Sequence, residues 1–150
     1  MPTPAEGETV QFRIPGDKKY VLMVRKAVNC IARNLGFSEE MAADIELSAS
    51  EAISNAVEHG SPEHGGNAVV VTCRIDAHAL TIDVRDEGPG FEPNLGGPDG
   101  DQSLTERGRG LQLIYHLMDS VKVSRTRKGS RVRMVKQVGA GRGSEQVRST

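Results

Sequence analysis

The sequence predicts an α+β fold, a two-layer α/β sandwich in which helices cover one face of an antiparallel-rich sheet. In some segments apolar residues alternate with polar ones, which is the pattern of a strand with one buried face. In others they recur every three or four residues, which is the pattern of an amphipathic helix. The two patterns follow one another in the order βααββαββ. This order is most simply arranged with the helices on one face of the sheet.

The first half of the chain predicts one strand and two helices. Residues 10–14 alternate between apolar and polar and form the strand. An amphipathic helix follows over 17–35 and ends at Gly36. Ser38 is the expected N-cap of the second helix, which runs to about His59. The apolar positions of this second helix, which we expect to be buried, are Ile45, Ala49, Ala52, Ile53 and Ala56.

Two further strands and a long loop come next. Residues 69–75 and 80–84 alternate, with a turn at 76–78 between them. Residues 87–108 contain six glycines and three prolines, and they predict a loop. A loop of that length inside a compact domain is more often functional than a simple connection.

The chain beyond this loop predicts a helix and a hairpin. The helix runs from about Arg109 to Asp119, and the strands cover 121–127 and 130–136. Residues 122–136 hold seven Lys or Arg and no acidic residue. Most of these are arginines at odd positions, so a solvated outer face of the sheet explains them. The apolar side of the helix consists of Leu111, Ile114, Tyr115 and Met118.

Length and composition favour one domain. We expect a folded domain over 8–137, with a flexible N-terminus at 1–7 and a disordered tail at 138–150. The net charge of −1 argues against binding nucleic acid through bulk electrostatics. No run of 18 apolar residues is present, and the N-terminal residues lack the layout of a signal peptide, so we expect a cytoplasmic protein. Cys30 and Cys73 are then reduced thiols.

The first candidate site lies on the second helix. Glu51 and Asn55 are four residues apart, so their side chains project from the same side, roughly opposite the apolar stripe. A carboxylate and a carboxamide are hard oxygen donors of the type that Mg²⁺ prefers. The alternative is a solvated helix face without a ligand.

The second candidate site follows a strand. Asp86 has the same parity as Leu80, Ile82 and Val84, so it continues the inward face of that strand. A buried carboxylate needs a donor, which is either a protein group or a ligand such as the exocyclic amino group of adenine. The glycines that follow, Gly88 and Gly90, either let the backbone approach that ligand or only begin the loop.

The third candidate site opens the third helix. Gly108, Arg109 and Gly110 combine small residues with a helix N-terminus, which suits a phosphate chain. The pattern is neither a P-loop nor a dinucleotide-binding fingerprint. An ordinary loop-to-helix turn is the alternative. Ser130 shares the inward face of the last strand, where its hydroxyl is able to complete a polar pocket beside Asp86.

These three segments together resemble a known family. Residues 46–60, ELSASEAISNAVEHG, resemble the N box of the GHKL ATPases; residues 86–91, DEGPGF, their first glycine box; and residues 106–121, ERGRGLQLIYHLMDSV, their second. The residue pattern of the first segment, together with Leu-Met-Asp after the glycines of the second glycine box, is most similar to the corresponding patterns of anti-sigma-factor serine/threonine kinases. The resemblance covers about residues 8–137.

The resemblance implies a role for each candidate residue. Asn55 would coordinate Mg²⁺ at the ATP phosphates, Glu51 would be the general base, and Asp86 would accept a hydrogen bond from the adenine amino group. Ser130 stands where relatives carry a hydroxyl near the adenine. The glycines would shape the lid and phosphate loop, and Arg107 or Arg109 would be the cation for the γ-phosphate because the lid has no lysine. The glycines concerned are Gly88, Gly90, Gly108 and Gly110.

The resemblance also implies partners and a function. It predicts a kinase that uses ATP and Mg²⁺ to phosphorylate an anti-anti-sigma protein and that sequesters a sigma factor, with a homodimer among its assemblies. The alternative is a catalytically silent module in which bound ATP or ADP controls partner binding. Neither interpretation involves a membrane or direct contact with nucleic acid.

Overall fold

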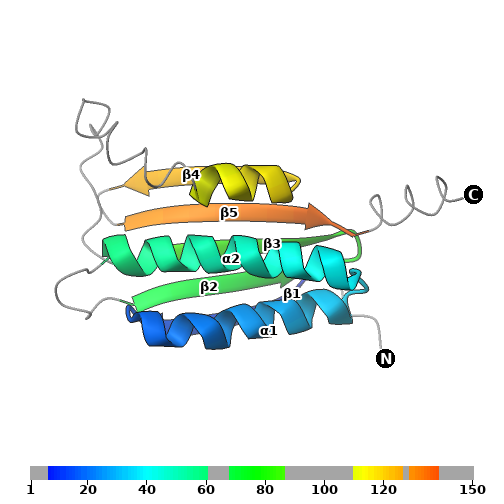
Figure 1. Ribbon diagram of the computed structural model, residues 1–150, viewed down its shortest axis with the longest axis horizontal. Helices are drawn as coiled ribbons and strands as arrows, with labels where there is room; N and C mark the ends of the chain where they lie inside the picture. Colours follow the sequence, from blue (N-terminus) through cyan, green and yellow to red (C-terminus); the bar gives the residue numbers. More distant parts are fainter. Residues whose placement is uncertain (1–6, 61–67, 87–109, 127–128, 139–150) are drawn as a thin grey trace, which may run out of the picture.

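The computed structural model describes residues 7–60, 68–86, 110–126 and 129–138. They form two layers, a five-stranded sheet and a layer of helices that covers one face of it (Figure 1). The α+β sandwich expected from the sequence is therefore confirmed. The elements are β1 (Glu8–Pro15), the short 3-10 helix η1 (Lys18–Tyr20), α1 (Val21–Asn34), α2 (Glu39–Gly60), β2 (Ala68–Ile75), β3 (Ala79–Asp86), a helix at 110–117, β4 (Ser120–Thr126) and β5 (Gly129–Gln137).

The sheet has the strand order β1-β2-β3-β5-β4, and each neighbouring pair is antiparallel. The turn between β2 and β3 falls where the sequence places it, because the Asp76 carboxylate accepts hydrogen bonds from the main-chain N–H groups of His78 and Ala79, both at 2.8 Å. The hairpin β4–β5 then lies beside β3, with Val84 opposite Val132.

Local hydrogen bonds explain where the helices begin and end. The carboxylate of Asp17 accepts a hydrogen bond from the Lys19 N–H at 3.0 Å and begins η1, so the single helix expected over 17–35 is a 3-10 turn followed by α1. Gly36, with φ of +100°, ends this helix in a conformation that side chains disfavour. Ser38 is the N-cap of α2, as predicted, since its Oγ accepts a hydrogen bond from the Met41 N–H at 3.1 Å.

The core lies between the helices and the inner face of the sheet. Leu80, Ile82 and Val84 of β3 are buried, and the apolar stripe predicted for α2 is buried along its whole length. In the helix at 110–117, Ile114 faces this core, but Tyr115 is 55% exposed and does not belong to the apolar side where the sequence placed it. None of the helices in the described parts of the chain is long and apolar enough to cross a membrane.

Candidate functional site

The structure describes five of the ten candidate residues. Glu51 and Asn55 lie on α2, Asp86 ends β3, Gly110 begins the described part of the third helix, and Ser130 lies on β5. The ends of these elements gather at one end of the sandwich, on the left in Figure 1, where α2 ends and β5 begins. The remaining candidates, Gly88, Gly90, Arg107, Gly108 and Arg109, lie outside the described residues.

Gly110 lies directly against the polar side of α2. A Cβ atom added to Gly110 would lie 2.8 Å from Glu51 Oε1 and 3.5 Å from Asn55 Nδ2. The absence of a side chain at this position therefore allows the main chain of the third helix to approach both polar groups. Packing between the two helices thus brings together residues of two separate motifs, although Gly110 is at least 55 positions away from Glu51 and Asn55 in the sequence.

The side chains of Glu51 and Asn55 are half-buried. They lie on the polar side of α2, and the contact with Gly110 shows that the third helix partly covers this side. Ser48, three residues before Glu51, is fully buried, and its Oγ has no hydrogen-bond partner within the part of the chain that the structure describes. Nothing in the sequence distinguishes Ser48, because a serine on a helix is usually solvated.

Asp86 is buried, with 2% of its surface exposed, as its parity predicts. Its Oδ2 accepts hydrogen bonds from the hydroxyl of Ser130 at 2.5 Å and from the Ser130 main-chain N–H at 3.2 Å. The two residues are 44 positions apart in the chain and meet because β3 and β5 are neighbours in the sheet. The structure therefore places the predicted carboxylate and hydroxyl in one hydrogen-bonded pair.

Gly129 also belongs to this site, although its sequence context does not reveal it. Its φ is +137°, and an added Cβ atom would collide with the main-chain oxygen of Asp86 and lie 2.9 Å from the carboxylate Oδ1. Only glycine therefore fits against Asp86 at the start of β5. The signal in the sequence is the pair Lys128-Gly129, which predicts a hairpin turn but does not predict a close approach to Asp86.

The arrangement offers two kinds of chemistry. The Glu51 carboxylate is able to accept a proton or bind a cation, and Asn55 adds a second oxygen ligand when its carboxamide is suitably turned. Among the described residues no group of three or more His, Cys, Asp or Glu gathers into a metal cluster. Mg²⁺ usually takes one or two protein oxygens and completes its shell with phosphates and water.

The five-stranded antiparallel sheet with helices on one face is the fold of a GHKL-type ATPase domain. The sequence profile of the histidine kinase-like ATPase domain matches residues 14–136, and the chain belongs to this family.

Several curated relatives are serine-protein kinases named RsbW. The protein from Halalkalibacterium halodurans is 33% identical over 124 residues, which cover 77% of this chain and 75% of the relative. The protein from Bacillus velezensis is 30% identical over 142 residues, which cover 89% of this chain and 88% of the relative. The match thus extends over most of both partners in each comparison.

Solved structures show the same fold. The RsbU and RsbW domains of Rv1364c from Mycobacterium tuberculosis align with a TM-score of 0.66 at 19% identity, over 90% of this chain and 32% of the solved chain. A blue-light activated histidine kinase from Erythrobacter litoralis aligns with a TM-score of 0.54 at 19% identity, over 84% of this chain and 43% of that chain.

Proposed function

We propose that the protein is a serine/threonine kinase of the anti-sigma-factor type. It binds ATP with Mg²⁺, phosphorylates a serine or threonine of an anti-anti-sigma partner, and sequesters a sigma factor. The observation that carries this proposal is the contact of Gly110 with Glu51 and Asn55, which unites the glycine segment and the acidic helix in one site. The serine-protein kinases among its relatives support the same activity.

In this proposal the polar side of α2, which carries Glu51 and Asn55, performs the transfer. Asn55 would hold Mg²⁺, and Glu51 would accept the proton of the substrate hydroxyl. The oxygen of that hydroxyl would bond to the γ-phosphorus as the bond between this phosphorus and the leaving ADP breaks. Bound ATP would supply the phosphoryl group and Mg²⁺ would neutralise part of its charge. The first described turn of the helix at 110–117 lies against Glu51 and Asn55, and helix N-termini favour anions.

The proposed adenine site is the pair Asp86–Ser130. One oxygen of Asp86 already accepts two hydrogen bonds from Ser130, which fixes the orientation of the carboxylate. A carboxylate so held is an acceptor for the amino group of adenine, and its burial strengthens that bond because water does not compete.

Replacing Glu51 by Gln and Asn55 by Ala separates binding from transfer. For Glu51→Gln we expect nucleotide affinity close to wild type and phosphate transfer slower by about 10²–10⁴-fold, because the proton acceptor is lost. For Asn55→Ala we expect weaker Mg-ATP binding and no transfer. The measurements are the dissociation constant of a fluorescent ATP analogue and the transfer of labelled γ-phosphate to a candidate anti-anti-sigma protein.

Glu58→Gln is the matched control, because Glu58 is an exposed glutamate on the same helix whose partner is Lys18. It should change neither quantity. Transfer by Glu51→Gln at the wild-type rate would show that Glu51 is not the base. ATP binding by the wild type without transfer to any such partner would favour the silent regulatory module instead.

A further inference from the structure

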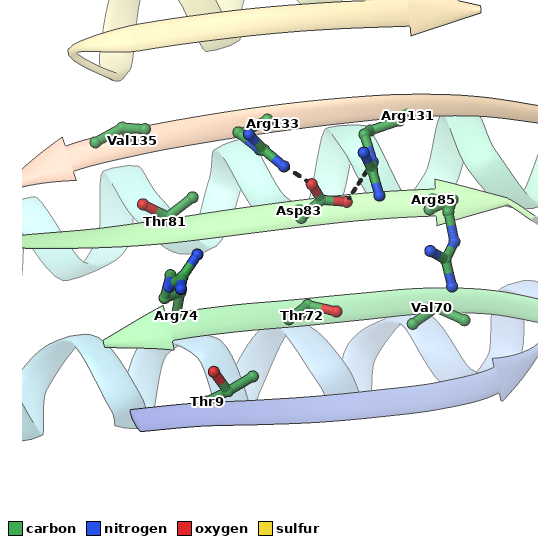
Figure 2. A pocket seen from close by; sticks show the side chains of 10 residues that line it. All are labelled: Thr9, Val70, Thr72, Arg74, Thr81, Asp83, Arg85, Arg131, Arg133 and Val135. Atoms are coloured by element: carbon green, nitrogen blue, oxygen red, sulfur yellow. Dashed lines mark hydrogen bonds and ion pairs between the residues drawn. The ribbon is translucent and has the colours of Figure 1, made fainter. Parts of the chain in front are cut away.

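The face of the sheet opposite the helices contains a hollow of about 540 Å³. Figure 2 shows this face from close by, with the helices behind the strands and ten labelled side chains in front. The lining residues come from β1, β2, β3 and β5, and they are three threonines, two valines, four arginines and one aspartate. The proposed kinase site uses none of them.

Strand register explains why this hollow is basic. Asp83 lies opposite Arg133, and Arg85 lies opposite Arg131, so these four side chains share one face of the sheet. Arg74 on β2 also lines the hollow. Four positive charges against one negative charge give a formal net charge of +3, whereas the whole chain carries −1. Positive charge is therefore concentrated here on a chain that has no excess of it overall.

One carboxylate holds two of these arginines in place. Arg131 Nε lies 3.1 Å from Asp83 Oδ1, and Arg133 Nε lies 3.2 Å from Asp83 Oδ2. The Asp83 side chain is only 13% exposed, while those of Arg131 and Arg133 are 41% and 50% exposed. Since a guanidinium has five N–H donors, each arginine keeps donors for a second acceptor. The pair is thus oriented before any ligand arrives, which reduces the entropy lost on binding.

We propose that this hollow is a docking site for an extended acidic segment of a partner protein, with carboxylates bound by Arg74, Arg131 and Arg133. Arginine binds carboxylates through two parallel hydrogen bonds, which makes it suited to such a segment. The threonine and valine side chains between the arginines provide hydroxyl groups and small apolar surfaces for the main chain and aliphatic parts of a peptide.

Other occupants fit the face less well. No aromatic side chain lines the hollow, so single-stranded nucleic acid would find nothing to stack on. A second copy docked face to face would place +3 against +3, and like charges across an interface are destabilising. The large exposed apolar residues of the described chain, Leu22, Met23, Leu47 and Tyr115, lie on the helices, so this face has none to insert into a lipid surface.

A fluorescein-labelled decaglutamate peptide tests the proposal by fluorescence anisotropy, with decaglutamine as the neutral probe. We expect decaglutamate to bind, decaglutamine not to bind, and binding to weaken as salt is raised. Arg74→Gln with Arg133→Gln should weaken binding at least about tenfold. This double variant leaves Asp83 paired with Arg131. Lys18→Gln with Arg33→Gln removes the same charge from the helix side and should leave binding unchanged.

Two further measurements complete the test. Arg131→Lys with Arg133→Lys keeps the charge but removes the planar guanidinium groups, and we expect weaker peptide binding with unchanged affinity for an ATP analogue.

An equal loss of decaglutamate binding in the Arg74→Gln, Arg133→Gln variant and in the Lys18→Gln, Arg33→Gln variant would overturn the proposal. Absence of decaglutamate binding by the wild type would also overturn it. Tighter binding of a DNA duplex or of anionic phosphatidylglycerol vesicles through the same arginines would also overturn it, and so would self-association lost in the Arg74→Gln, Arg133→Gln variant. None of these outcomes depends on phosphate transfer, so the proposal fails or stands separately from the kinase function.

Discussion

Gly110 and Gly129 both lie against acidic side chains, but an added methyl group would meet different atoms at the two positions. At Gly110 the nearest atom is Glu51 Oε1, the far end of a flexible side chain. At Gly129 it is the main-chain oxygen of Asp86, which the sheet fixes in place. The same substitution therefore tests function at one site and stability at the other.

Replacing each glycine by alanine should separate these effects. For Gly110→Ala we expect a free energy of unfolding within about 1 kcal/mol of wild type, because Glu51 is able to move, but at least about tenfold slower phosphate transfer because the carboxylate is displaced. For Gly129→Ala we expect a loss of about 2–4 kcal/mol, from the collision and from a φ of +137° that a side chain disfavours. Urea denaturation gives the stabilities and the transfer assay gives the rates. A larger loss of stability in Gly110→Ala than in Gly129→Ala would contradict this assignment of the contacts.

The sequence predicted the inward position of Asp86 and the neighbourhood of Ser130, because both follow from the period of two along a strand. It did not predict Gly129 as their neighbour. A positive φ and a main-chain contact across the sheet both require a glycine, but a glycine in the sequence does not show which of its many possible causes applies. The ion pairs of Asp83 with Arg131 and Arg133 were missed for a related reason. They depend on the register of β3 against β5, which the odd parity of the arginines does not define.

Among the elements, α2 carries the proposed base and metal ligand, and its first turn was predictable. Ser38 precedes two glutamates and an apolar stripe, a pattern typical of a helix start, and the structure confirms the cap. The contact of α2 with the helix at 110–117 was not predictable, because it depends on packing between segments separated by two strands and the predicted long loop.

Removing the cap of α2 should destabilise the fold without changing the site. For Ser38→Ala we expect a loss of about 1 kcal/mol in the free energy of unfolding, because the Met41 N–H loses its acceptor. Ser38→Asn supplies another capping oxygen and should restore most of this loss. Affinity for an ATP analogue should stay unchanged in both variants, since Ser38 caps the start of α2 and Asn55 lies near its end. A loss in Ser38→Asn as large as in Ser38→Ala would argue against the cap.

The stability of the whole molecule is linked to pH through a core thiol. Cys73 is fully buried on β2, and burial raises the pKa of this thiol from 9.0 to about 12. A folded-state pKa above the unfolded one means that its contribution to stability is fully present below pH 9 and is lost as pH rises towards 12.

We therefore expect the free energy of unfolding to fall with a slope approaching about 1.4 kcal/mol per pH unit from this group between pH 9 and 12. Other groups also titrate in this range, so the measurement compares wild type with Cys73→Ala by urea denaturation at several pH values. The variant should be less stable below pH 9, owing to the cavity, but should lose less stability at higher pH. Parallel curves for the two proteins would contradict the raised pKa.

In the sequence, α1 and α2 lie between β1 and β2, although these two strands are neighbours in the sheet. This order has a consequence for synthesis of the chain on the ribosome. Ile14 of β1 pairs with Val69 of β2, so 55 residues must be added before the first strand meets its partner. At 5–20 residues per second this takes about 3–11 s. During that interval the apolar side chains of Val10, Phe12 and Ile14 have no β2 beside them. Among the described strands, β1 is thus the one that a nascent-chain chaperone has a long opportunity to bind before its partner is made.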